Sequence, residues 1–173
     1  TNNMLYLQST DSIADIIGAD TTGSTRIRSE AGELSFWIGG NASSSTATSA
    51  TEQLRITNDG VRAYNQAAPA AIDTSATATI ANLKTGLITS STAAAVTITL
   101  PTGTNCDGGF NGVYTNLTFE WSVINTGATN AVTVAGNTGH TIVGSATVAA
   151  SNSGRFASRR TAANTWVTYR LSS

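Results

Sequence analysis

Short segments in which every second residue is apolar, often with threonine between, recur along the second half of this chain. They span residues 76–80, 95–100, 116–124, 131–135, 141–148 and 165–171. A period of two places the apolar side chains on one face of a β-strand, and no window of the chain repeats apolar residues at helical spacing. Gly, Asn and Pro separate the segments at intervals typical of sandwiches and barrels. The sequence therefore predicts an all-β fold.

The first 66 residues contain shorter apolar segments than the rest of the chain. These lie at 4–8, 14–17, 25–28, 34–38, 53–57 and 61–63, and the low-complexity stretch 41–51 divides them. That stretch is too poor in large apolar residues to form a core, so we expect a loop at a surface or a subunit boundary. Pro69 restricts the backbone beside it to an extended path. We therefore expect two modules, 1–66 and 67–173, that meet at 67–71.

The composition limits the chemistry that either module can perform. Thr, Ala, Ser, Gly and Asn fill 105 of the 173 positions, only 11% of the residues are charged, and the chain has one His, one Cys and one Lys. Few combinations remain for an acid/base site, a thiolate site or a soft-metal site. The composition favours a scaffold or binding protein, and we expect no enzymatic activity, no catalytic residue, no cofactor and no metal.

Charge and hydropathy restrict the partners. The net charge is -1 and the pI is about 5.7, so no overall field attracts nucleic acid or an anionic membrane. Residues 1–75 carry a net charge of -4 and residues 76–173 one of +3, which fits two modules. No apolar run approaches the roughly 20 residues of a membrane span, and the opening TNNMLYLQ lacks the features of a signal peptide. We expect a soluble protein without nucleic-acid or membrane partners, processed at its start or cut from a longer chain.

The first module has too few large apolar residues to fold alone. Its short strands would bury little surface at about 25 cal/mol per Å², whereas ordering costs roughly 1–2 kcal/mol per residue. The single Cys106 cannot form an intrachain disulfide. Other chains must supply the missing burial, and we expect a homotrimer whose short strands wrap around copies of themselves and hide their edges.

Two passages resemble known protein families. The run ADII (14–17), GSTRIRS (23–29), GELSFWIG (32–39), a spacer and EQLRITNDG (52–60) resembles modules of phage tail fibres and related virion appendages, with VRAY (61–64) in place of their usual VGIG. The run FEWSVINTG (119–127), SGRF (153–156), RRT (159–161) and WVTYR (166–170) is similar to C-terminal β-rich domains of marine and cyanobacterial phage structural proteins.

The resemblance implies a homotrimeric structural protein of a phage virion, assembled in the host cytoplasm and found on the extracellular particle. Residues 1–66 would form an interwoven shaft or attachment segment, and 67–173 a jelly-roll-like β-sandwich head. Such a protein is a surface fibre, spike or capsid decoration that contacts other capsid or tail proteins. The alternative that the resemblance leaves open is a receptor-binding module for host-surface carbohydrate.

Aromatic and basic residues of the second module are the candidate binding residues. Trp166 shares a strand face with polar side chains, which predicts exposure, and Tyr114 follows the Gly-rich loop 107–112. Exposed rings of this kind can stack on sugars, whereas the competing interpretation is a core or trimer contact. Arg155 and Arg159 share a strand face and could bind a polyanion through bidentate guanidinium contacts, or pair with Glu120 across the sheet.

The remaining reactive residues favour structural roles. We expect His140 at a loop tip or trimer contact, because no nucleophile elbow accompanies it. Cys106 has neither a second thiol nor a nearby base in sequence, which predicts an inert thiol. Glu30 and Glu33 flank an Ala-Gly turn and are expected to be charged hairpin residues instead of a glycosidase pair. The acids Asp11, Asp15 and Asp20 match no calcium loop and are expected in solvated turns.

Overall fold

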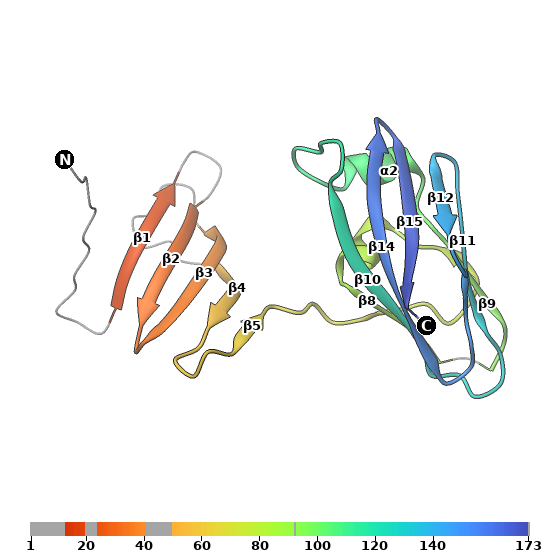
Figure 1. The fold of residues 1–173 in the computed structure, drawn as a ribbon, viewed down its shortest axis with the longest axis horizontal. Helices are drawn as coiled ribbons and strands as arrows, with labels where there is room; N and C mark the ends of the chain where they lie inside the picture. The colour runs from red at the N-terminus through yellow and green to blue at the C-terminus, as the bar shows by residue number, and fades with distance from the viewer. Residues whose placement is uncertain (1–12, 20–23, 41–49, 92, 173) are drawn as a thin grey trace. The chain divides into compact units, whose positions relative to one another are not determined.

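The computed structural model describes residues 13–19, 24–40, 50–91 and 93–172. The chain divides into two compact units, unit 1 (Thr1–Asn65) and unit 2 (Gln66–Ser173), so the expected boundary after residue 66 lies one residue from the observed one. Both units consist mainly of β-strands (Figure 1), which confirms the prediction of a β-rich chain.

Unit 1 is a single antiparallel sheet in which each strand pairs with the next along the chain (Figure 1). The strands are β1 (Ile13–Ala19), β2 (Ser24–Glu30), β3 (Glu33–Gly40), β4 (Thr51–Ile56) and β5 (Arg62–Tyr64). Between β2 and β3, Ala31 and Gly32 have φ values of 51° and 80°, as a two-residue hairpin turn requires. All five strands overlap predicted segments, while the predicted segment 4–8 and residues 41–49 of the spacer lie outside the described residues.

Unit 2 contains two sheets. The six-stranded sheet has the order β12-β15-β14-β10-β8-β6, from β6 (Ala70–Ala71), β8 (Leu87–Ser90), β10 (Thr118–Asn125), β12 (His140–Val143), β14 (Asn152–Ala162) and β15 (Thr165–Ser172). The four-stranded sheet has the order β13-β11-β9-β7, from β7 (Ala76–Thr77), β9 (Val96–Thr99), β11 (Val132–Ala135) and β13 (Thr147–Val148). Parallel pairs occur in both, including β8 with β10, β12 with β15 and β9 with β11, whereas a jelly roll is antiparallel.

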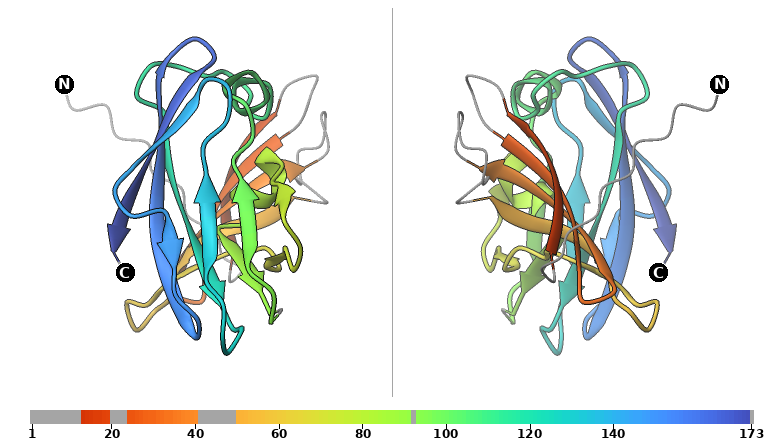
Figure 2. Two further views of the ribbon diagram at one scale, coloured as in Figure 1. Left: turned by 90° about the vertical axis from the view of Figure 1, so that its right-hand side faces the viewer. Right: turned by 90° about the vertical axis from the view of Figure 1, so that its left-hand side faces the viewer.

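The two sheets of unit 2 enclose a common hydrophobic core. In the left view of Figure 2 the green and cyan strands β9 and β11 of the four-stranded sheet face the viewer. Their Val96, Ile98, Val132 and Val134 pack in one cluster with Ile88, Trp121, Val123 and Phe156 of the six-stranded sheet. Trp121 stacks on Phe156 with ring centroids 4.7 Å apart. Trp121 and Val123, two positions apart on β10, therefore lie on the core face of this strand.

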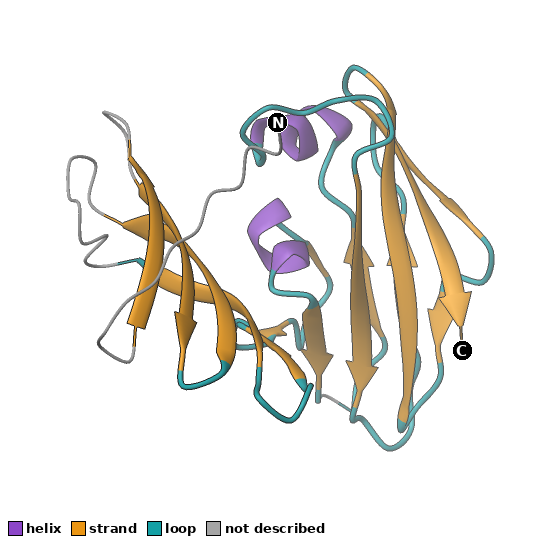
Figure 3. Ribbon diagram, turned by 60° about the vertical axis from the view of Figure 1, so that its left-hand side comes forward, coloured by secondary structure: helices purple, strands orange, loops and turns teal. Residues whose placement is uncertain are grey.

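Two short helices of unit 2, purple in Figure 3, are absent from the prediction. They are α1 (Ile80–Lys84) and α2 (Gly103–Gly108), the latter at one end of the strands (Figures 1 and 3). Each starts at a threonine cap: Thr79 accepts a hydrogen bond from the backbone N–H of Asn82, and Thr102 accepts one from that of Asn105. Because each helix has at most six residues, neither produces a helical repeat of apolar positions.

Two predicted strands are longer than the observed ones. In both, a local change of backbone conformation interrupts the extended chain. The segment 76–80 is extended only in β7, because the cap of α1 follows. The segment 141–148 forms β12 and β13, which belong to different sheets, and Gly144 between them has a φ of 95°.

Candidate functional site

The two faces of the unit 1 sheet have opposite chemistry. The pairing register places one apolar residue from each strand in a continuous row across the sheet: Ile16, Ile27, Phe36, Leu54 and Tyr64. Leu34 and Ile56 pair beside this row, and Ile38 lies on the same face. We call these eight residues the apolar face.

Much of the apolar face is exposed among the described residues. The exposed fractions reach 47% for Ile16, 57% for Ile38 and 68% for Tyr64, although all three side chains are large and apolar or aromatic. The described part of unit 1 contains this sheet and no second layer that could cover it. Sheets of soluble proteins bury their apolar face against another element, so this face has the character of an interface.

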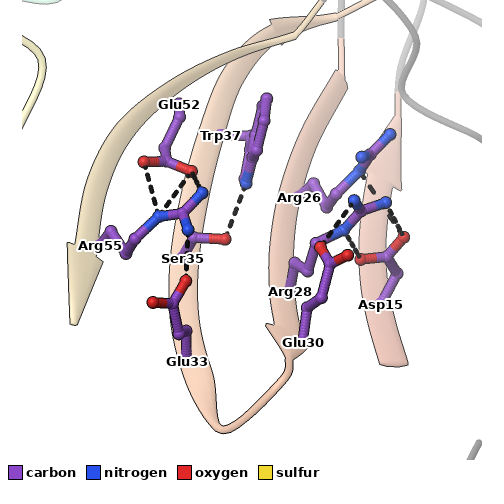
Figure 4. A network of polar contacts seen from close by, with 9 residues as sticks. All are labelled: Asp15, Arg26, Arg28, Glu30, Glu33, Ser35, Trp37, Glu52 and Arg55. Carbon is purple, nitrogen blue, oxygen red and sulfur yellow. Dashed lines mark hydrogen bonds and ion pairs between the residues drawn. The ribbon is translucent and has the colours of Figure 1, made fainter. Parts of the chain in front are cut away.

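The opposite face of the same sheet carries a network of ion pairs (Figure 4). Arg28 donates two hydrogen bonds to Asp15, at 2.9 and 3.0 Å, and a third to Glu30 at 3.3 Å. Arg55 binds Glu52, with Nε 3.0 Å from Oε1, and also Glu33. The guanidinium of Arg28 lowers the pKa of Asp15 through its hydrogen bonds, which keeps that carboxylate charged.

Trp37 completes this polar network. Its Nε1 donates to Ser35 Oγ at 2.8 Å, and the guanidinium carbons of Arg26 and Arg28 lie 5.7 and 5.9 Å from its ring centre. Cation–π contacts of this kind hold the long side chains flat on the sheet. In this network each of the four carboxylates lies in an ion pair with one or more of three arginines, and the group has a net charge of -1.

The acidic residues singled out in the sequence have structural environments in unit 1. Glu30 and Glu33 flank the β2–β3 turn as expected, and each is bound to a different arginine. Asp15 lies in strand β1 in contact with Arg28, so its expected place in a turn is wrong; Asp11 and Asp20 lie outside the described residues. Over the described ranges, no group of three His, Cys, Asp or Glu residues could hold a metal ion.

A chain of buried hydrogen bonds crosses the interior of unit 2. Trp121 Nε1 donates to Ser158 Oγ (2.9 Å), Ser158 lies 2.7 Å from Thr168 Oγ1, and Thr168 lies 2.8 Å from His140 Nε2. His140 Nδ1 is 3.0 Å from the carbonyl oxygen of Pro101. These partners assign the imidazole as neutral, with Nδ1 donating to Pro101 and Nε2 accepting from Thr168.

His140 is therefore not at a loop tip, and that prediction is wrong. It is the first residue of β12, is paired with Trp166 of β15, and is fully buried. Burial lowers its pKa, with an opposing effect from the hydrogen bond to Pro101. The turn residues 136–139 before it suggested a surface position, but the β-bridge between Asn137 and His140 directs the strand into the sheet.

The fold also brings an imidazole close to Cys106, which the sequence does not predict, but in the tautomer assigned above the facing nitrogen, Nδ1, carries a proton and cannot accept one from the thiol. The Sγ atom lies 3.5 Å from His140 Nδ1, across 34 positions of sequence. The thiol is nevertheless fully buried, and burial, together with the charge of Asp107, raises the pKa of Cys106 to about 12. Because the thiolate is the nucleophile, this pair has no nucleophilic thiolate at neutral pH. The expectation of an inert thiol agrees with these surroundings.

Asp107 joins α2 to the six-stranded sheet. Its carboxylate accepts hydrogen bonds from Arg160 Nε and Nη2, both at 2.9 Å, from Trp166 Nε1 at 2.7 Å and from the backbone N–H of Asn164 at 2.9 Å. These four donors, led by Arg160, hold the pKa of Asp107 well below its usual range.

The predicted carbohydrate residues do not form one site. Trp166 is 0% exposed, so its predicted exposure is wrong: Asp107 holds its indole N–H, and Phe110 stacks on its ring with centroids 5.9 Å apart. Alternation correctly groups Trp166 with Thr168 on one face, but that face is the covered one. Tyr114 is 62% exposed, as expected, in the segment before β10.

The two candidate arginines lie on β14. Arg155 forms an ion pair with Glu120, which confirms the pairing considered from the sequence. Arg159 is partly exposed, and its Nε is buried without a hydrogen-bond partner in the described part of the chain.

Comparison with known proteins identifies no relative: no family model, no curated protein and no solved structure matches this chain. Among the described residues, no helix has both the length and the apolar character needed to cross a membrane.

Proposed function

We propose that this chain is a non-enzymatic structural protein that assembles as a homotrimer through unit 1, as a surface fibre, spike or capsid decoration of a phage virion. In this proposal unit 1 is the attachment and trimerisation segment, and unit 2 is the head. Other capsid or tail proteins are its further partners. The resemblance of residues 14–60 to tail-fibre modules supports the virion assignment, and the apolar face of unit 1 carries the proposal of assembly.

The apolar face supports self-association for an energetic reason. A five-stranded sheet with one apolar side needs a second layer, and at about 25 cal/mol per Å² the exposed aliphatic and aromatic area is a strong driving force for burial. The other face carries the charged side chains of the polar network, so that face can remain in water. Copies of the same sheet, facing each other around an axis, would complete the missing layer.

The interior of unit 2 supports a non-enzymatic role. Its reactive side chains, Cys106, His140 and Asp107, are engaged with one another or with sheet residues, and the first two are fully buried. Such groups stabilise a packed domain and have no contact with a substrate in solution.

The test is the solution mass of the full chain and of the variant Ile27→Asp. Ile27 lies within the apolar row, between Ile16 and Phe36, so a buried carboxylate there should convert the proposed trimer of 17.7 kDa subunits to monomers. Ala63→Asp is the matched control, because Ala63 lies opposite Arg55 on the polar face and is exposed. Light scattering that finds a monomeric full chain at micromolar concentration would exclude the proposed assembly.

A further inference from the structure

The outer face of the six-stranded sheet holds a compact group of charged and aromatic side chains. Ala157 of β14 lies opposite Glu120 of β10 on one side and opposite Tyr169 of β15 on the other. Arg155 and Arg159 lie two positions before and after Ala157, so they point to the same face. We call these five residues the Arg159 cluster.

The Arg159 cluster has two guanidinium groups and one carboxylate. Glu120 is diagonal to both arginines in the register, yet its ion pair is with Arg155. Arg159 has no hydrogen-bond or ion-pair partner within the described residues, and its Nε is buried. The cluster therefore has one positive charge without a counterion.

The other cations of unit 2 differ from Arg159 in this respect. Arg160 is paired with Asp107, and Lys84 donates to the carbonyl oxygen of Gly109 at 2.9 Å. Arg170 lies over the Phe156 ring, 4.9 Å from its centre, and donates to backbone carbonyls. Arg159 is the one basic residue of the described part of unit 2 for which no such contact exists.

The surroundings of Arg159 have the composition of a saccharide site. Ala157 lies on the outer face between Glu120 and Tyr169 and is only 8% exposed, so it forms a small floor beside these longer side chains. Tyr169 is partly exposed beside that floor, and Thr118 lies directly opposite Arg159. The Tyr169 ring can contact a sugar ring, the Thr118 hydroxyl can form a hydrogen bond, and the unpaired guanidinium of Arg159 can bind an anion. These three groups together match a sugar that carries an anionic group.

We propose that the Arg159 cluster binds an anionic polysaccharide, with Arg159 contacting a carboxylate or sulfate group and Tyr169 contacting the sugar ring. A single unpaired guanidinium beside an aromatic ring fits a polymer that repeats one charge per sugar or disaccharide. It does not fit nucleic acid, whose binding requires several phosphate contacts, and the chain has a net charge of -1. This proposal does not depend on the assembly of unit 1.

The test measures binding of the full chain to two anionic polymers and their neutral counterparts. The probes are polygalacturonate with its methyl ester, and dextran sulfate with dextran, which separate carboxylate from sulfate recognition. We expect wild type to bind at least one anionic polymer, to bind neither neutral polymer, and to lose affinity as salt rises. Arg159→Gln should weaken binding about tenfold, because charge-assisted hydrogen bonds are lost.

Two further variants make the result specific. Glu120→Gln should strengthen binding, because it removes the only carboxylate of the cluster. Lys84→Gln removes the same charge elsewhere on unit 2 and should leave affinity within about twofold of wild type. Arg159→Lys keeps the positive charge at this position. Thermal unfolding of both Arg159 variants shows whether any loss of binding in Arg159→Gln comes from a loss of folding. No binding to either anionic polymer, or an equal loss in Lys84→Gln and Arg159→Gln, would overturn the proposal.

Discussion

At the scale of single residues, His140 links the stability of unit 2 to pH. Its two ring nitrogens are both used by uncharged partners, Thr168 and Pro101, and the nearest titratable side chain, Cys106, is a neutral thiol. A proton added to Nε2 would remove the acceptor to which Thr168 donates and force that hydroxyl to reorient. The charged ring would also be buried away from water, with no carboxylate among its hydrogen-bond partners. The native state therefore disfavours the imidazolium.

We expect the free energy of unfolding of unit 2 to fall as the pH drops below about 6.5, the usual pKa of histidine. The pKa of His140 is lowered in the folded chain, so the unfolded chain binds more protons in that range and stability rises with pH. A single titrating group limits this slope to at most about 1.4 kcal/mol per pH unit.

Chemical denaturation at several pH values measures this slope. His140 is the only histidine of the chain, so carboxyl groups titrating nearer pH 4 are the main other contribution. His140→Gln, which can still accept from Thr168 and donate to Pro101, should have a flat profile over the same range. Parallel profiles for the variant and wild type would contradict this assignment.

At the scale of secondary-structure elements, α2 depends on a single side chain for its attachment to the sheet. Asp107 lies within this six-residue helix and binds donors from β14, from β15 and from the turn between them. Removal of one partner from a largely buried ion pair leaves the other charge uncompensated, which is the costly case.

Asp107→Asn should therefore lower the melting temperature of unit 2 by at least about 5 °C at pH 7. The asparagine oxygen can still accept from Trp166, but the amide group cannot neutralise Arg160. Because the pKa of Asp107 is lowered in the folded chain, its contribution is present above about pH 4 and is lost as the pH falls below that value.

Calorimetry of wild type, Asp107→Asn and Asp73→Asn distinguishes this attachment from a general effect of charge. Asp73 is an exposed acid that accepts hydrogen bonds from the backbone N–H and hydroxyl of Ser91 and has no arginine partner. Its substitution should lower the melting temperature by much less. Equal shifts in the two variants would show that α2 does not depend on the Asp107 ion pair.

The same elements show how far the sequence predicts this fold. The alternation of apolar and polar residues predicts β10, β11 and β15 and the residues that share a face of each strand. This is possible because the two-residue repeat of a strand is visible in as few as four residues. It does not say which face another element covers, and this is why Trp166, under α2 and Phe110, was expected to be exposed. The approach of Cys106 to His140 and the unpaired Arg159 depend on contacts between distant segments, for which the sequence has no local pattern.

At the scale of the whole molecule, the two units differ in where their apolar side chains go. Unit 2 buries its large apolar residues between two sheets, with Trp121, Phe156 and Trp166 all fully enclosed. Unit 1 leaves most of its aliphatic side chains on one exposed face, and its low exposures are found among polar residues such as Ser24 and Ser35. Unit 2 has the enclosed core of an autonomous domain, whereas the described part of unit 1 leaves its apolar face exposed, and this difference supports the proposal that unit 1 assembles with other copies.

Deletion of residues 1–65 should therefore leave a folded monomer, whereas the full chain should be the proposed trimer of 17.7 kDa subunits. Unit 2 keeps its core and every hydrogen bond of the Trp121–His140 chain, because all of these residues follow position 65. Light scattering measures the two masses, and the near-ultraviolet circular dichroism of the enclosed tryptophans reports the fold of the shortened chain.

The control is the full chain with Ile27→Asp, which should match the deletion in oligomeric state while retaining all residues. A shortened chain that remains trimeric would move the interface into unit 2 and remove the role assigned to the apolar face. A shortened chain that is monomeric but unfolded would show instead that the core of unit 2 is not enough to fold this unit by itself. Unit 2 would then need the assembled unit 1 in order to fold.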